Sequence, residues 1–124
     1  MTDYRNLTVN VERNNSEQLF VFRIEGVLDA QTSPDLEKEI SKVIDEDNNW
    51  LLINLEGLDY ISSAGIRTLM ATSKKIDAMK GKFALCSPSN NVFSTIKNSG
   101  FGNFFVWKDT EEEALGVFST PRQR

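Results

Sequence analysis

Residues 55–67, LEGLDYISSAGIR, decide the fold because a strand pattern changes into a helix pattern within them. The apolar run Leu51–Leu55 leads into this stretch, and apolar side chains recur at helical spacing from Ile66 to Ile76. Ser62 and Ser63 therefore stand where a strand meets the N-terminus of a helix. Backbone N–H groups there lack helical partners and carry the positive end of the helix dipole. A phosphate on one of these serines would be well tolerated.

Ser62 and Ser63 allow two compatible interpretations. Serine is a preferred N-cap, because its side-chain oxygen accepts a hydrogen bond from a first-turn N–H group. One serine can therefore start the helix while the other points outward as a site of modification. Neither serine stands in the Gly-x-Ser-x-Gly pattern of a hydrolase nucleophile.

Strand and helix patterns alternate along the rest of the chain. We expect strands at residues 7–13, 19–24, 50–55, 82–87 and 104–107. We expect a first helix that starts at Ser33-Pro34, with Ser33 as cap, and ends at about residues 45–49. A second helix is expected from the serine pair to about Met79. A short helix from Ser89 to Ser99-Gly100 and a last helix from Thr110 to Phe118 follow. Asn14-Asn15-Ser16 is expected to turn the first two strands into a hairpin, and Gly26 to end the second strand pattern. Alternating strands and helices imply parallel pairing, so we predict an α/β fold with a small mixed sheet of about four to five strands and helices packed on it.

Three polar features have structural interpretations. Asn54, inside the apolar strand pattern, is expected to be hydrogen-bonded or near a sheet edge. The single cysteine, Cys86, is expected to be a small buried side chain. Glu111–Glu113 follow Thr110 as a capping box and are interpreted as support for the helix start, not as a metal site.

Composition excludes several classes of function. The chain has 124 residues, no histidine and a net charge of −4. The acidic balance argues against nucleic acid as a partner, and the absence of histidine argues against a Ser-His-Asp hydrolase and most zinc or haem sites. No Gly-rich loop with lysine follows a strand, and no apolar run approaches the ~20 residues that span a bilayer. The sequence therefore predicts a cytoplasmic protein that is not an enzyme and has no cofactor, no metal and no membrane partner; the basic end Pro121–Arg124 is given no function.

The same motifs resemble the STAS domain of bacterial anti-sigma-factor antagonists. The resemblance rests on Gly26-Val27-Leu28-Asp29, the apolar strand ending at Leu55, the segment Ile61–Ile66 and the late Ser99-Gly100-Phe101. It covers the chain from about Leu7 to Phe118 in both motif order and element order. It implies one STAS domain over residues 1–124, with its core at about 7–118.

The resemblance also implies a switch. Family members are phosphorylated on a serine in this motif by their partner, an anti-sigma factor that is also an ATP-dependent serine kinase. The unphosphorylated form binds that partner and releases its target, and a PP2C-type phosphatase regenerates it. Matched by position, the phosphorylated residue is Ser63, with Ser62 as the alternative. Many members read Asp-Ser-Ser/Thr-Gly-Leu, whereas here Ser62 takes the aspartate position and Ala64 follows the acceptor; the Ser-Ser-Ala-Gly variant also occurs in the family.

A partner surface is predicted around these serines. Its candidate residues are Asp29, Asp59, Ser62, Ser63, Ala64, Gly65 and Arg67. For Asp29 two interpretations stay open, a contact to the partner or its nucleotide site and a carboxylate that closes a turn. Asp59 is expected in the loop before the serines as a turn residue, with surface contact second. Ile66 and Met70 are expected in the core, which leaves Arg67 exposed.

Two other functions compete with the switch. A STAS domain can also be an unphosphorylated scaffold or accessory subunit of a transport or signalling complex. An enzyme that uses Ser63 with Asp29 and Asp59 around a divalent ion is a third hypothesis, which high-affinity ion binding or turnover would support. In the family the free protein is expected to be a monomer.

Overall fold

The computed structural model of the protein describes residues 6–14, 18–44 and 48–119. Within these ranges five strands form one sheet whose spatial order is the order of the sequence. The strands are β1 (Leu7–Asn14), β2 (Leu19–Leu28), β3 (Trp50–Ile61), β4 (Lys82–Cys86) and β5 (Trp107–Lys108). β1 pairs antiparallel with β2, and every later pair is parallel. The predicted mixed sheet is confirmed.

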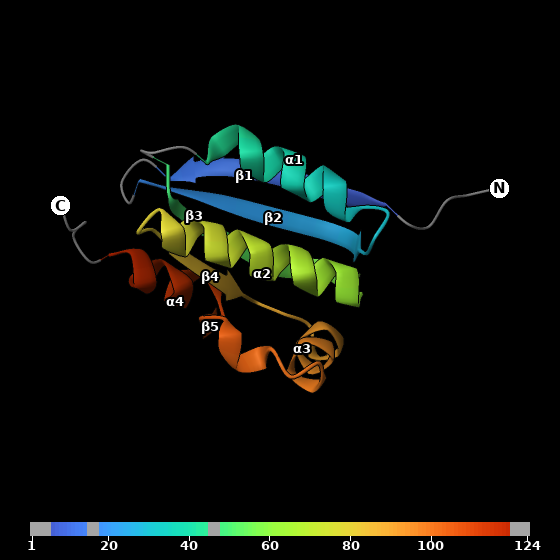
Figure 1. The fold of residues 1–124 in the computed structure, drawn as a ribbon. Coiled ribbons are helices and arrows are strands. Elements are labelled where there is room, and N and C mark those ends of the chain that lie inside the picture. The colour runs from blue at the N-terminus through green and yellow to red at the C-terminus, as the bar shows by residue number, and fades with distance from the viewer. Residues whose placement is uncertain (1–5, 15–17, 45–47, 120–124) are drawn as a thin grey trace.

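Helices cover both faces of the sheet (Figure 1). The helices are α1 (Ser33–Val43), α2 (Ser63–Ala78), α3 (Asn90–Asn98) and α4 (Glu111–Leu115), with 3-10 turns η1 (Gly102–Phe104) and η2 (Gly116–Phe118). α1, α2 and α3 share one core cluster with the sheet, whereas α4 and η2 contribute to a second, smaller cluster. The second cluster is closed by Phe118, whose ring centroid lies 5.9 Å from that of Trp50.

β3 explains why two clusters form. Its side chains alternate between the faces, so Leu51 and Ile53 join the larger cluster while Trp50 and Leu52 join the smaller one. All four are buried, as expected for a central parallel strand covered on both faces. β3 therefore carries the serine segment directly out of the centre of the core.

Two strands are longer than predicted. β2 continues through Gly26 to Leu28, and β3 continues through Asp59 to Ile61, because their parallel pairing extends to the pair Leu28–Ile61. Gly26 does not end the strand; it adopts φ +106° inside it, where a Cβ atom would collide with the backbone oxygen of Asn6. The prediction that Asp59 lies in a loop is wrong.

Two smaller predictions also need correction. The last strand is Trp107–Lys108 and not 104–107, because the chain makes the η1 turn first and the Trp107 indole N–H donates to the Gly102 oxygen at 2.8 Å. The N-cap of α1 is Thr32 and not Ser33, since the helix turn already begins at the Asp29 loop, where the Ser33 N–H donates to the Asp29 oxygen at 2.8 Å.

Some predictions concern residues outside the described ranges. These are the turn at Asn15 and Ser16 and the basic end at 121–124. The first helix, expected to run to about residues 45–49, ends earlier, at Val43, because the backbone is already extended at Ile44. The expectation of one domain over residues 1–124 with a core at 7–118 stays a prediction.

Candidate functional site

The two serines at the start of α2 have different environments. Ser62 is the N-cap, is half-buried, and its hydroxyl oxygen accepts from the Gly65 N–H at 3.2 Å. Ser63 is the first residue of the helix and is exposed. Its hydroxyl forms no hydrogen bond within the described part of the chain. The capping interpretation is therefore confirmed for Ser62, and Ser63 is the serine that faces outward; its modification stays a prediction.

The charge at this helix start is uncompensated. α2 has 16 residues and carries no acidic side chain in its first turn, whereas α4 carries three glutamates there. The first turn of α2 thus presents the positive end of the helix dipole without a carboxylate of its own. Ser63 is the residue on which an added negative charge would meet that potential.

The end of β2 supports the serine segment from the side. The Ser62 N–H donates to the Leu28 backbone oxygen at 2.9 Å. Gly65 is buried next to this contact, and a Cβ atom there would lie 2.6 Å from the Leu28 oxygen and 2.8 Å from Ile61 Cγ1. A larger residue at position 65 would therefore push the helix start away from the sheet.

Asp29 closes the loop that follows β2. Its carboxylate is buried, with 3% of the residue exposed, and Oδ1 accepts from the Gln31 N–H at 2.9 Å and the Thr32 N–H at 3.0 Å. The turn-closing interpretation is thus what the geometry shows. A contact from Asp29 to a partner stays a prediction.

Asp59 lies on the exposed side of β3 and forms no turn. Its backbone oxygen accepts from the Asn91 side-chain amide at 3.0 Å, which ties β3 to the start of α3. The proposed surface contact of its carboxylate stays a prediction.

Arg67 separates two grooves on the helix face. One groove lies between α1 and α2 and includes Ala64 and Arg67 in its lining. The other has a volume of about 560 Å³, runs along α2 from Ser63 past Arg67, and is bounded by Phe101 on the segment after α3. As predicted, Arg67 is exposed and Ile66 is buried. Met70, expected in the core, is only partly buried because it lines this second groove.

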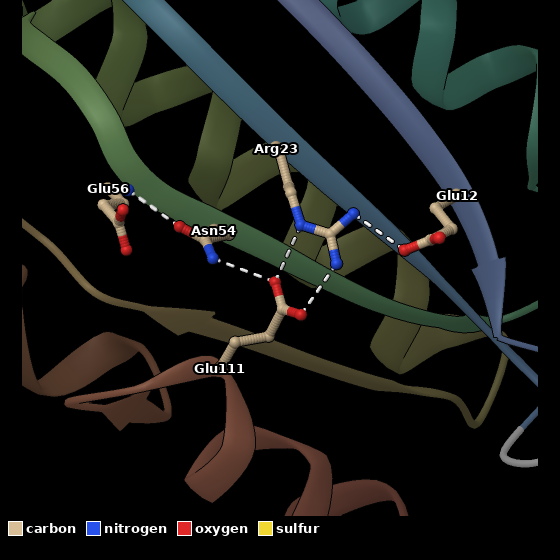
Figure 2. Close-up of polar contacts among 5 residues, drawn as sticks. All are labelled: Glu12, Arg23, Asn54, Glu56 and Glu111. Carbon is tan, nitrogen blue, oxygen red and sulfur yellow. Dashed lines mark hydrogen bonds and ion pairs between the residues drawn. The ribbon is translucent and has the colours of Figure 1, made fainter.

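A polar network lies on the other face of the sheet (Figure 2). The Arg23 Nε and Nη2 groups donate to the two carboxylate oxygens of Glu111 at 3.0 and 2.7 Å, and Arg23 Nη1 donates to Glu12 at 2.8 Å. The Asn54 side-chain amide donates to Glu111 at 2.9 Å, which confirms that Asn54 is hydrogen-bonded. The guanidinium of Arg23 holds the pKa of Glu111 below its ordinary value. Glu111 therefore fixes α4 to β2 and β3, beyond the support of its own helix start.

The described residues contain no group of three or more cysteine, aspartate or glutamate side chains that could hold a metal ion. None of the described helices is both long and apolar enough to cross a membrane.

Comparison with known proteins gives consistent similarities. The STAS domain family matches residues 9–114. A relative in Bordetella bronchiseptica, BtrV, named as a candidate anti-sigma factor antagonist, is 30% identical over 101 residues, which is 82% of this chain and 87% of BtrV. The crystal structure of an anti-sigma factor antagonist from Mycobacterium paratuberculosis covers 97% of this chain and 100% of its own, with a TM-score of 0.83 and 24% identity. The structure of the anti-sigma factor antagonist SpoIIAA in its unphosphorylated form covers 93% of this chain and 100% of its own, with a TM-score of 0.75 and 25% identity.

Proposed function

This chain belongs to the STAS domain family, and from that premise we propose that it is an anti-sigma factor antagonist switched off by phosphorylation of Ser63. The unphosphorylated form binds an anti-sigma factor that is also a serine kinase, and a PP2C-type phosphatase restores it. The observation that carries the proposal is an exposed Ser63 at the first position of α2, whose hydroxyl has no hydrogen-bond partner among the described residues, beside a Ser62 that already serves as cap. The SpoIIAA structure is described as the unphosphorylated form, which supports a phosphorylation cycle in that similar protein.

The helix start favours Ser63 over Ser62 as the acceptor. The Ser62 hydroxyl is half-buried and accepts from the Gly65 N–H, so a phosphate there would have to replace the cap. The Ser63 hydroxyl is exposed, and modifying it removes no described hydrogen bond. Because both serines lie at the same helix N-terminus, the helix dipole does not distinguish them as acceptors. Their different accessibility does.

A phosphate on Ser63 leaves the domain folded and blocks a partner. Phosphoserine adds roughly −1.5 to −2 charges, and a helix N-terminus favours such a charge by about 0.3–1 kcal/mol. A partner packed on the same helix start would bury that charge without a counter-ion, at a cost of several kcal/mol. A loss of about 4 kcal/mol weakens binding about a thousandfold. The switch therefore needs no conformational change in this chain.

This function is that of a binding protein rather than an enzyme. The Asp29 carboxylate accepts hydrogen bonds from its own turn. Asp59 is an exposed residue of β3. The described residues also contain no group of three or more cysteine, aspartate or glutamate side chains that could hold a metal ion. Turnover by the isolated protein would contradict the proposal.

Mass spectrometry tests the modification. We expect the protein purified from its native cells to carry one phosphate on the peptide that contains Ser63, and the Ser63→Ala variant to carry none. Phosphate on Ser62 would keep the switch but move its site by one residue. No phosphate under any growth condition would instead favour an unphosphorylated scaffold or accessory subunit.

Partner capture tests the consequence. Tagged protein is expected to retain an anti-sigma factor, and Ser63→Asp to lose it. Ser41→Asp is the matched control, because Ser41 is also exposed but lies on α1 away from the helix start. Equal capture by Ser63→Asp and Ser41→Asp would refute the switch.

A further inference from the structure

The groove beside Ser63 combines an apolar surface with basic side chains. Its floor and wall are apolar, formed by Ile66, Met70 and the exposed ring of Phe101. Its two charged lining residues are both basic, Arg67 and Lys74 on α2, and no acidic side chain lines it among the described residues. On a chain with net charge −4, this is a locally positive, apolar surface.

The basic residues stand at a defined spacing. Arg67 and Lys74 are seven residues apart on α2, which is two helical turns and about 10 Å along the axis. Met70 lies between them on the same stripe of the helix. Neither basic side chain forms an ion pair within the described part of the chain, so both are available to a partner.

We propose that this groove binds an amphipathic helix of the anti-sigma factor, with apolar side chains against Met70 and Phe101 and carboxylates two turns apart facing Arg67 and Lys74. The course of the groove along α2, its apolar wall, and its two basic side chains without an ion-pair partner among the described residues support that occupant. The identity of the partner rests on the function proposed above; the chemistry of the groove does not.

The groove also gives the switch a direct electrostatic element. Ser63 lines one end of it, one helical turn before Arg67. A phosphate there repels an acidic helix and at the same time pairs with the arginine that would receive its carboxylate. Arg67 is thus a specificity residue in the unphosphorylated protein and a counter-charge in the phosphorylated one.

A pair of synthetic peptides tests the groove without any cellular partner. The first is a helix of about 15 residues with leucines on one face and glutamates bordering it seven residues apart; its twin has lysine at each glutamate position. In NMR spectra of the unphosphorylated full chain, the glutamate peptide is expected to shift the amide signals of Ile66, Met70 and Phe101, and the lysine peptide is not. Equal shifts by both peptides, shifts elsewhere, or no binding at millimolar peptide would overturn the proposal.

Charge reversal sharpens the test. The double variant Arg67→Glu/Lys74→Glu is expected to bind the glutamate peptide roughly tenfold more weakly and to acquire binding of the lysine peptide. Lys38→Glu/Lys75→Glu is the matched control, since it makes the same change in net charge at exposed helix positions outside the groove. If the control variant bound the glutamate peptide as weakly as the groove variant, the net charge of the protein alone would explain the loss of affinity, and the proposal would fail.

An aromatic pair tests the apolar wall. Phe101 and Phe104 are 42% and 40% exposed, but only Phe101 lines the groove. Phe101→Ala is expected to lower the affinity for the glutamate peptide severalfold, and Phe104→Ala to leave that affinity unchanged. Thermal unfolding checks that both variants fold. If the groove signals instead shift with protein concentration alone, a second copy occupies the groove and the proposal fails. None of these results depends on whether cells phosphorylate Ser63, so the groove and the switch can fail separately.

Discussion

Replacing Glu111 with glutamine is expected to loosen the attachment of α4 to the sheet. The carboxylate receives two hydrogen bonds from Arg23 and one from Asn54, and its side chain is 28% exposed. The amide keeps the size of the side chain but removes the charge, and it offers one acceptor oxygen in place of two. A bidentate carboxylate–arginine pair in a partly buried position is therefore reduced to a neutral contact.

The expected loss is about 1.5 kcal/mol of unfolding free energy. Hydrogen bonds to charged groups contribute about 1.5–3 kcal/mol, and we take the lower end because Arg23 is 39% exposed and water can replace the lost contact. For a domain of this length the loss corresponds to a fall in melting temperature of about 5 °C. Glu112→Gln is the matched control, because it removes the same charge from the same helix turn, at an exposed position that does not contact Arg23. It is expected to cost less than about 0.5 kcal/mol.

Urea unfolding at several pH values checks this prediction. Because Arg23 lowers the folded-state pKa of Glu111, the contribution is complete above the unfolded-state pKa of the carboxyl group and is lost as the pH falls through the lowered value. The difference between wild type and Glu111→Gln should thus be full at neutral pH and shrink in acid. Equal losses for Glu111→Gln and Glu112→Gln, or a difference independent of pH, would refute the reasoning.

Three further changes test other parts of the structure. Ser62→Ala removes the cap of α2 and is expected to cost about 1 kcal/mol in urea unfolding, whereas Ser63→Ala should stay near wild type because its hydroxyl is exposed and unbonded. Gly65→Ala would place a Cβ atom 2.6 Å from a backbone oxygen and is expected to cost about 1–3 kcal/mol, while Gly116→Ala, with nothing within 4 Å, should be neutral or slightly stabilising in thermal unfolding. Cys86 is fully buried, and desolvation raises the pKa of its thiol to about 11, so a thiol reagent at pH 8 should react only as fast as the protein opens.

Local sequence patterns predicted the order of the elements but not where β2 and β3 end. Gly26 and Asp59 are poor strand residues by propensity, and each was expected to stand outside a strand. The parallel ladder extends to the pair Leu28–Ile61; it pairs Gly26 with Leu58 and passes Asp59 at a register shift without ending β3. Pairing between strands more than thirty residues apart thus overrides the preference of single residues, and that information is not present in either segment alone.

The serine pair could be predicted because its signal is local. A strand pattern, two hydroxyls and a helix pattern within a few residues are enough to place a cap and an exposed neighbour. The contact between Arg23 and Glu111 joins residues 88 positions apart, so the sequence showed only a glutamate at a helix start. The groove was missed for the same reason, since Phe101 reaches it from a segment separate from α2.

The strand order of the sheet bears on how the chain assembles during synthesis. Each of the strands β2 to β5 pairs with the strand made immediately before it, so only β1 waits for a later strand before it finds its first neighbour. A ribosome that releases the chain from the N-terminus therefore delivers the hairpin first and then one strand–helix unit at a time, each onto an edge already in place. The growing edge of the sheet is always the newest strand, and it stays open only until the next unit emerges. In this topology, translation order and assembly order can coincide.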